Sequence, residues 1–245
     1  MKALIFNSGL GSRMGTLTKD KPKAMLRLPN GETIFERQIR ILSDCGITEF
    51  VVTLGYLKEQ IIKASESFSG IRFEFVYNPQ YETTNYIYSM YLAKSHIDGD
   101  MLILHGDLVF NKELIVKILA DKEKTLCLYN EKLPLSEKDF KGRVQNGLLK
   151  EVSVNIFDSD CFAFQPLYKL SKDIAVMWVN QVERFVKRGE KNVYAENALN
   201  QILDNTEIRA FSYNGDYITE VDNMSDYTSV CAITADKQSA YTCMY

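Results

Sequence analysis

The most constraining feature of this chain is a short apolar run that breaks into a glycine-rich loop near its start. Residues 3–13 read Ala-Leu-Ile-Phe-Asn-Ser-Gly-Leu-Gly-Ser-Arg. An apolar run of this kind predicts a buried strand, and Gly9 and Gly11 allow backbone N–H groups to approach a ligand closely. Arg13 and Lys23 then add two cations. The segment therefore predicts a strand that leads into a polyphosphate-binding loop.

Two common nucleotide-binding patterns do not fit this loop. A dinucleotide-binding G-x-G-x-x-G sequence would need glycine where the chain has Met14, and Gly15 comes one residue too late. The P-loop pattern does not fit either, because no Gly-Lys-Ser or Gly-Lys-Thr follows. A plain connecting turn remains an alternative for the glycines alone, since glycine turns commonly join strands to helices.

Size and composition favour a single domain over residues 1–245. The chain has 245 residues, of which 46% are hydrophobic, enough for one sizeable core. Its 29 basic and 32 acidic residues are mixed along the chain and give a net charge of −3, so we expect neither nucleic acid nor an anionic membrane as a partner. No apolar run approaches the roughly twenty residues that a membrane span needs. No signal-peptide pattern follows the first residue.

The cysteines predict neither a zinc site nor a disulfide framework. They are five in number and lack C-x-x-C spacing. Reduced thiols fit best with a cytoplasmic protein. The residues are Cys45, Cys127, Cys161, Cys231 and Cys243.

Strand-like and helix-like segments alternate through the first half of the chain. This order is typical of an α/β fold with a doubly wound, mostly parallel, Rossmann-like sheet. We expect strands at residues 3–6, 50–54, 71–77, 101–104, 125–129, 209–213 and 217–221. We expect helices between Thr33 and Gly46 and at residues 57–68, 85–97, 112–120, 178–187 and 195–203.

The pattern weakens to short strands and turns between residues 131 and 164. A small α+β insertion that binds an acceptor would look like this. We therefore predict that residues 131–200 form an acceptor-binding or lid subregion of the single domain. Lys141 and Arg143 lie in this segment and are candidates for the acceptor phosphate, with a solubilising surface role as the alternative.

Two acids end predicted strands, where ligands of open α/β sheets bind. Asp107 follows a buried strand through Gly106, whose missing side chain would leave room for a nucleotide. Asp222 follows the strand at residues 217–221. Carboxylate oxygens suit Mg²⁺, so we predict that this pair binds it. An ordinary turn at Asp107 and a helix cap at Asp222 are the alternatives, although Asp226 fits the capping role better.

The loop resembles the signature of the nucleotidyltransferase superfamily that activates phosphorylated small molecules, L-x-A-G-x-G-x-R followed by Pro-Lys. Here residues 4–13 carry the first part and Pro22-Lys23 the second, while Asn7 and Ser8 replace the usual small residues and a proline common near Thr16 is absent. The strand–Gly–Asp element and the Val-Asp-x-x-x-Asp pattern at residues 221–226 also resemble this superfamily.

This resemblance implies a GT-A-like fold and a set of residue roles. Asp107 and Asp222 would bind Mg²⁺, Arg13 would support the triphosphate, and Lys23 would contact phosphate in the transition state. The expected nucleotide-binding residues are Asn7, Ser8, Gly9, Gly11, Asn78, Thr84 and Gly106. No protein nucleophile or general base is needed, because the acceptor's own ionised oxygen can attack the α-phosphorus. His105 is assigned only proximity to the site.

A segment at residues 78–90, Asn-Pro-Gln-Tyr-Glu-Thr-Thr-Asn-Tyr-Ile-Tyr-Ser-Met, is similar to the N-x-x-Y-x-x-T-N-N-x-Y-S-L stretch of the cholinephosphate cytidylyltransferase branch. An ammonium acceptor would favour an aromatic and acidic pocket. The candidates for that pocket are Tyr88, Glu196 and Trp178, although a solvent-facing acid in a helix and packed aromatic residues are the plainer interpretations.

These patterns predict a Mg²⁺-dependent cytidylyltransferase that joins CTP to a phosphorylated or phosphonylated small molecule, with phosphocholine as the leading acceptor, and releases pyrophosphate. A sugar-1-phosphate nucleotidyltransferase is the near alternative. A catalytically silent nucleotide-binding regulatory domain is the alternative of another class. No pattern in the sequence indicates an oligomeric state.

Overall fold

The computed structural model describes the backbone of residues 1–242 and the side chains of residues 1–235. Cys243 lies outside the described residues. None of the helices in this part of the chain combines the length and the apolar character needed to cross a bilayer.

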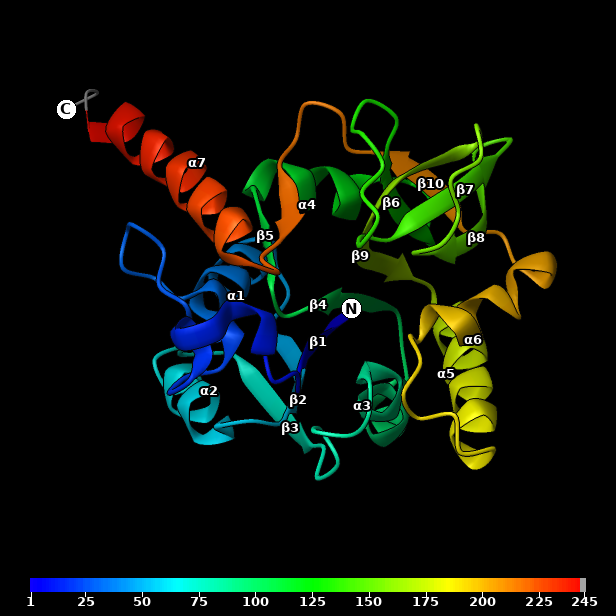
Figure 1. The fold of residues 1–245 in the computed structure, drawn as a ribbon, viewed down its shortest axis with the longest axis horizontal. Coiled ribbons are helices and arrows are strands. Elements are labelled where there is room, and N and C mark those ends of the chain that lie inside the picture. The colour runs from blue at the N-terminus through cyan, green and yellow to red at the C-terminus, as the bar shows by residue number, and fades with distance from the viewer. Residues whose placement is uncertain (243–245) are drawn as a thin grey trace.

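A nine-stranded mixed sheet lies at the centre of the described residues (Figure 1). Its strands follow the order β3-β2-β1-β4-β9-β6-β10-β8-β7. They are β1 (Lys2–Asn7), β2 (Glu49–Leu54), β3 (Arg72–Tyr77), β4 (Met101–His105), β6 (Leu126–Asn130), β7 (Lys141–Gln145), β8 (Leu148–Ser153), β9 (Cys161–Leu170) and β10 (Arg209–Ser212).

The predicted fold class is confirmed, but the sheet is more mixed than we expected. β1 pairs in parallel with β2 and β4, and β2 pairs in parallel with β3. The long strand β9 then runs antiparallel between β4 and β6, and β10 returns parallel to β6. β7 and β8 form an antiparallel pair, and β7 also pairs antiparallel with β9. Parallel pairing is therefore concentrated in the first half of the sheet.

Helices cover both faces of this sheet. β1 shows the reason, because Ala3 and Ile5 enter one hydrophobic core while Leu4 and Phe6 enter the other, as in a strand buried on both faces. The first core contains α1 (Ile34–Asp44), α2 (Lys58–Ser65) and α4 (Lys112–Ala120). The second contains α3 (Tyr86–Leu92), α5 (Lys172–Lys187) and α6 (Glu196–Asn200). Short 3₁₀ turns are η1 (Ser12–Thr18), η2 (Lys23–Met25), η3 (Lys94–His96) and η4 (Leu203–Asn205).

The helix predicted after Thr33 begins as the sequence indicates. Glu36 N donates a hydrogen bond to Thr33 Oγ1 at 3.1 Å, and Thr33 N donates to Glu36 Oε2 at 2.7 Å. This capping box satisfies backbone donors that the first turn of a helix leaves free. The apolar positions Ile34, Phe35 and Ile39 are fully buried. α1 is thus fixed by its cap and by its buried face.

A separate two-stranded ribbon joins two segments that lie far apart in the sequence. β5 (Leu108–Phe110) pairs antiparallel with β11 (Ile218–Glu220), and Glu220 lies opposite Leu108. One residue further on, Val221 N donates to the carbonyl oxygen of Asp107 at 3.0 Å. This pairing places Asp222 next to Asp107.

Some elements extend beyond the sequence prediction. α5 begins at Lys172, six positions before the expected start at Trp178. Residues Met224–Thr242 form α7, a helix that extends away from the body of the molecule (Figure 1). Asp226 has the predicted first-turn role, since its Oδ2 accepts from Asp222 N at 2.9 Å and from Asn223 N at 3.1 Å.

Residues 131–200 do not form a separate layer. They supply β7, β8, β9, α5 and α6, and the three strands belong to the same sheet as β1. A role of this segment in binding an acceptor stays a prediction.

Candidate active site

A cavity of about 410 Å³ opens where β1 and β4 end. This is the edge at which open α/β sheets bind ligands. The cavity is lined by Phe6 to Arg13, Pro22 to Ala24, Tyr81, Glu82, Thr84 to Tyr86, His105 to Asp107, Lys138, Phe140, Val154, Asn192, Tyr194, Glu220 and Asp222. Among these are the predicted site residues Asn7, Ser8, Gly9, Gly11, Arg13, Lys23, Thr84, Gly106, Asp107 and Asp222.

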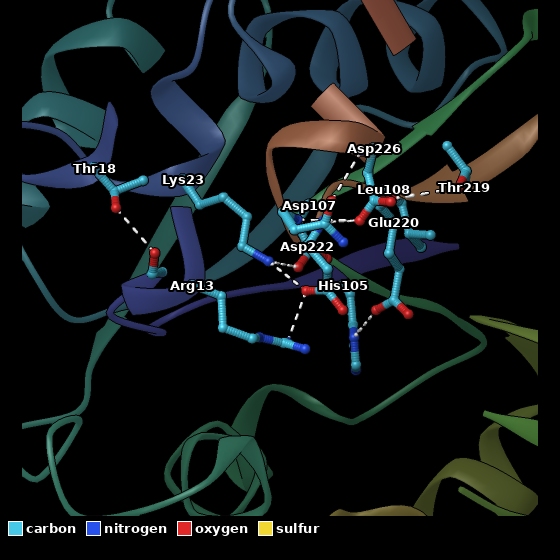
Figure 2. A network of polar contacts seen from close by, with 12 residues as sticks. Arg13, Thr18, Lys23, His105, Asp107, Leu108, Thr219, Glu220, Asp222 and Asp226 are labelled. Atoms are coloured by element: carbon cyan, nitrogen blue, oxygen red, sulfur yellow. Dashed lines mark hydrogen bonds and ion pairs between the residues drawn. The ribbon is translucent and has the colours of Figure 1, made fainter. Parts of the chain in front are cut away.

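Four charged side chains form one connected cluster on the cavity wall. Lys23 Nζ donates to Asp107 Oδ2 at 2.5 Å and to Asp222 Oδ1 at 2.8 Å. Arg13 Nη2 also donates to Asp222 Oδ1 at 2.8 Å. Figure 2 shows both cationic side chains pointing toward the two acids. The predicted cations and the predicted metal ligands therefore contact each other directly.

The cluster is mostly shielded from water. The side chains of Lys23, Asp107 and Asp222 are each less than one-fifth exposed, whereas that of Arg13 is 61% exposed. Burial alone would lower the pKa of Lys23, but the charges of Asp107 and Asp222 outweigh it and raise that pKa. Burial would likewise raise the pKa of Asp107, and the charge of Lys23 holds it below its usual range. Lys23 is therefore an ammonium and Asp107 a carboxylate.

The donor set fits a magnesium ion. Asp107 Oδ1 is buried and has no hydrogen-bond partner among residues 1–235, so one oxygen of this carboxylate has no protein partner. Asp222 supplies a second carboxylate, and Mg²⁺ commonly uses only one or two carboxylates besides phosphate and water. His105, Asp107 and Glu220 also bring potential ligand atoms within 4.8 Å of one another. Magnesium prefers oxygen ligands, which favours the aspartate pair over the histidine.

Gly106 makes room for a protein side chain, and the room for a nucleotide that we expected there stays a prediction. A Cβ atom at position 106 would lie 1.7 Å from Asn7 Oδ1 and 2.8 Å from the carbonyl oxygen of Phe6. The carboxamide of Asn7 therefore lies against the backbone of Gly106. Both residues still line the cavity.

A hydrogen-bond network joins Ser8 of the glycine loop to Ser89 and Asn78. Ser8 Oγ and Ser89 Oγ are 2.6 Å apart, and Asn78 Nδ2 donates to Ser89 Oγ at 3.0 Å and to Thr84 Oγ1 at 3.1 Å. Asn78 is 1% exposed and does not line the cavity. The predicted nucleotide ligand Asn78 thus holds other residues in place. Gly55, which the sequence did not single out, lies against the same loop. A Cβ atom at this position would lie 2.3 Å from the Ser8 carbonyl oxygen.

The predicted acceptor residues do not line the cavity. Trp178 is 1% exposed and donates through Nε1 to the carbonyl oxygen of Ala195 at 2.9 Å. Glu196 is also 1% exposed and accepts from Tyr168 Oη at 2.8 Å, and burial raises its pKa to about 8. Tyr88 is 9% exposed and stacks on Tyr91 at 6.0 Å between ring centroids. These three belong to the protein interior.

Other aromatic residues line the cavity instead. The Tyr86 ring lies 5.2 Å from Phe6, 4.5 Å from His105 and 6.4 Å from Tyr194, measured between centroids. Phe140 lies 5.0 Å from Tyr194. We call Phe6, Tyr86, His105, Phe140 and Tyr194 the aromatic wall.

An acid adjoins this wall. Glu220 Oε1 lies 2.9 Å from His105 Nδ1, and burial together with the neighbouring charges of Asp107 and Asp222 raises the pKa of Glu220, against the effect of His105. The position of Glu220 in the sequence could have indicated that it lies near the site. It lies two positions before Asp222, and alternate residues of a strand share a face.

The two basic candidates of the insertion are engaged elsewhere. Lys141 is fully buried, and its Nζ donates to the Ser136 carbonyl oxygen at 2.5 Å. Arg143 pairs with Glu151, Asp158 and Asp160 at 3.2, 2.5 and 2.6 Å. Lys138 is the basic residue of this segment that lines the cavity.

Comparison with known proteins identifies the class. A family model for the MobA-like NTP transferase domain matches residues 3–132, more than half of the chain, and the protein belongs to this family. It is accordingly an enzyme of the nucleotidyltransferase class, as the glycine loop and the strand-end acids predict.

Within this class the chain is similar to cytidylyltransferases along most of its length. It is 27% identical to the choline-phosphate cytidylyltransferase of Streptococcus pneumoniae, over 93% of this chain and 95% of that protein. It is 26% identical to the CTP:phosphoglutamine cytidylyltransferase of Campylobacter jejuni, over 92% and 97%. The 2-aminoethylphosphonate cytidylyltransferase of Lancefieldella rimae is 25% identical over 91% and 89%. The resemblance to the cholinephosphate branch is confirmed.

A relative that acts on a sugar phosphate matches a shorter segment. The UTP–glucose-1-phosphate uridylyltransferase AglF of Haloferax volcanii is 33% identical over 46% of each chain. Among solved structures, the CTP:phosphocholine cytidylyltransferase of Streptococcus pneumoniae has the same fold, with a TM-score of 0.79 at 24% identity over 95% of this chain and 98% of that one.

Proposed function

We propose that this protein is a Mg²⁺-dependent cytidylyltransferase that joins CTP to a phosphorylated or phosphonylated small molecule carrying an amine, with release of pyrophosphate. Phosphocholine is the leading acceptor. The observation that carries the proposal is that one cavity combines the Lys23–Asp107–Asp222 cluster with the aromatic wall and Glu220. The cationic side chains of the cluster suit a polyphosphate, and the aromatic wall with Glu220 suits an ammonium group.

CTP is proposed as the nucleotide because the relatives that this chain matches along most of their length are named cytidylyltransferases. The choline-phosphate, phosphoglutamine and 2-aminoethylphosphonate enzymes are all cytidylyltransferases that this chain covers almost completely. Their acceptors differ, but each name describes a small molecule with a phosphate or phosphonate. An amine is common to choline phosphate and 2-aminoethylphosphonate.

The cationic side chains would neutralise phosphate charge. Arg13 is exposed at the mouth of the cluster and can bind the triphosphate, and Lys23 can reach phosphate oxygens when it leaves the acids. Mg²⁺ bound by Asp107 and Asp222 would supply Lewis-acid stabilisation of the phosphoryl oxygens. Such positioning and charge stabilisation account for most of the catalysis of phosphoryl and nucleotidyl transfer.

The amine of the acceptor binds to the aromatic wall and Glu220 and so positions the acceptor. Aromatic faces attract a quaternary ammonium by cation–π interaction, worth about 0.5–2 kcal/mol. Glu220 supplies the matching negative charge once an ammonium favours its ionised form. Lys138, at the edge of the cavity, is our candidate partner for the acceptor phosphate.

The reaction then needs no protein nucleophile. An oxygen of the acceptor phosphate or phosphonate forms a bond to the α-phosphorus of CTP, and the bond from that phosphorus to the bridging oxygen of the β-phosphate breaks. Pyrophosphate leaves with the electron pair of the broken bond. The attacking oxygen is already ionised near neutral pH, so no general base is required.

A pyrophosphate-release screen tests this function. Four nucleotides are crossed with phosphocholine, other amino-alcohol phosphates, aminophosphonates and sugar 1-phosphates, with Mg²⁺ present. We expect turnover with CTP and an amine-bearing acceptor. Turnover confined to sugar 1-phosphates would favour a sugar-1-phosphate nucleotidyltransferase, the candidate that the uridylyltransferase relative supports. Tight CTP binding without turnover would favour a silent regulatory domain.

The metal assignment has its own test. Asp107→Asn and Asp222→Asn should each abolish Mg²⁺-dependent pyrophosphate release, because each removes one anionic ligand. Asp204→Asn is the matched control, since Asp204 is exposed and lies in η4 outside the cavity. Full activity of the Asp107 and Asp222 variants would refute the assignment.

A further inference from the structure

The ammonium of Lys23 lies between the two acids that are proposed to bind the metal. Its Nζ is 2.5 Å from Asp107 Oδ2 and 2.8 Å from Asp222 Oδ1, so one nitrogen bridges both carboxylates (Figure 2). A divalent cation that used these two oxygens would need the same space. The protein therefore carries its own cation between the two acids that are proposed to hold the metal.

The charges in the cluster are already balanced. Lys23 and Arg13 carry two positive charges, and Asp107 and Asp222 carry two negative charges. A divalent ion that took these two oxygens without a nucleotide would have to displace the ammonium, and it would then lie beside two cations next to side chains that are less than one-fifth exposed. Such like-charge contacts are strongly unfavourable where water is scarce.

A nucleotide changes this balance. Its triphosphate brings several negative charges to the glycine loop, and these give Lys23 and Arg13 new partners in the same cavity. Lys23 can then leave the acids without losing its ion pairs. The two carboxylates become free for the metal at the same time.

We infer that Lys23 occupies the metal position in the ligand-free protein, so that the metal binds together with the nucleotide and only weakly before it. The inference rests on the proposed function, because it assumes that Asp107 and Asp222 bind a divalent ion. It adds a role for Lys23 as a positioning residue that couples metal binding to triphosphate binding.

Direct measurement of Mn²⁺ binding tests this coupling without reference to turnover. Mn²⁺ serves as the probe, and free Mn²⁺ is followed by electron paramagnetic resonance with and without α,β-methylene-CTP, after the Mn²⁺ bound by the analogue in a protein-free titration is subtracted. Wild-type protein should bind Mn²⁺ weakly alone and at least about tenfold more tightly with the analogue, a factor typical of coupled sites. Lys23→Met should bind Mn²⁺ without nucleotide at least about tenfold more tightly than wild type does.

Two variants locate the effect. Lys21→Met is the matched control, since Lys21 lies two residues away, is 41% exposed and contacts only Asp20 at 3.8 Å among the ion pairs found in residues 1–235. It should leave Mn²⁺ affinity unchanged. Lys23→Met/Asp107→Asn should lose the gain, because one of the exposed carboxylates is gone.

The outcomes separate the inference from the proposed function. Equal Mn²⁺ affinity of Lys23→Met and wild type without nucleotide overturns the inference, provided that wild type binds Mn²⁺ with the analogue. No Mn²⁺ binding by wild type even with the analogue overturns the metal assignment itself, and the inference with it.

A second measurement on the wild-type protein covers the case in which Lys23→Met does not fold. The ¹⁵Nζ resonance of Lys23 should stay unchanged when Mg²⁺ alone is added and should shift when Mg²⁺ and the analogue are added together. A shift of this resonance with millimolar Mg²⁺ alone would overturn the inference.

Discussion

The carboxamide of Asn7 occupies the space that a side chain at position 106 would need. A Cβ atom on Gly106 would lie 1.7 Å from Asn7 Oδ1. Asn7 ends β1 and Gly106 follows β4, so this contact holds the ends of two adjacent strands at the floor of the cavity. The site thus depends on a glycine for a packing reason inside the protein.

Gly106→Ala should therefore damage both the fold and nucleotide binding. The added methyl group must push away the Asn7 side chain and the carbonyl oxygen of Phe6, and overpacking of this kind costs about 1–3 kcal/mol. We expect a lower free energy of unfolding in urea and weaker binding of a CTP analogue. Gly99→Ala is the control, because no atom lies within 4 Å of a Cβ built there.

A double variant tests the proposed contact. Asn7→Ala/Gly106→Ala removes the shortest clash but leaves the one with the Phe6 carbonyl at 2.8 Å, so it should recover part of the lost stability. If the two changes in the free energy of unfolding prove additive, the clash between the Asn7 side chain and a methyl group at position 106 does not limit stability.

The aromatic wall predicts how the acceptor is held. Tyr194 is 38% exposed and faces Phe140 and Tyr86 in the cavity, so Tyr194→Leu should remove an aromatic face with little loss of stability. KM for phosphocholine should rise about 2- to 30-fold, the range of one cation–π contact, while KM for CTP stays the same.

Tyr77→Leu is the control for this prediction. Tyr77 is a similarly exposed tyrosine, 44% exposed, and it contacts Lys58 away from the cavity. An equal rise of KM in both variants, or a rise for CTP as well, would argue against an ammonium site at the aromatic wall.

The sequence predicted more of the residues on the proposed nucleotide side of the cavity than on the proposed acceptor side. Arg13, Lys23, Asp107 and Asp222 could be expected to lie together, because a glycine loop and strand-end acids are local patterns and the fold brings strand ends together. The parallel order of β1, β2 and β4 followed from the alternation of strands and helices. The direction of β9 did not, because no local pattern encodes whether a strand runs parallel or antiparallel to its neighbours.

Burial explains why the acceptor candidates chosen from the sequence do not line the cavity. Glu196 begins a short helix and would ordinarily face water there, yet it lies against Tyr168 in the core. Trp178 sits on the buried face of α5. The residues that we propose in their place, Phe140, Tyr194 and Glu220, come from three separate segments of the chain that meet only in the folded protein.

The buried Glu196 gives the protein a pH-dependent stability. Its pKa in the folded protein is about 8, raised by burial, whereas the exposed carboxyl of the unfolded chain has a pKa near its ordinary value of about 4.3. Between these values the folded protein binds the proton more tightly than the unfolded chain does. Stability from this group is therefore fully present below about pH 4.3 and is lost as the pH rises toward 8.

Glu196→Gln should remove this dependence, because glutamine does not titrate and can still accept the hydrogen bond from Tyr168. In urea unfolding, the variant should gain stability relative to wild type between pH 5 and 8, by an amount on the order of a few kcal/mol. Glu207→Gln, an exposed acid, is the control and should follow wild type. A constant difference between Glu196→Gln and wild type across this range would mean that Glu196 is ionised in the folded protein throughout.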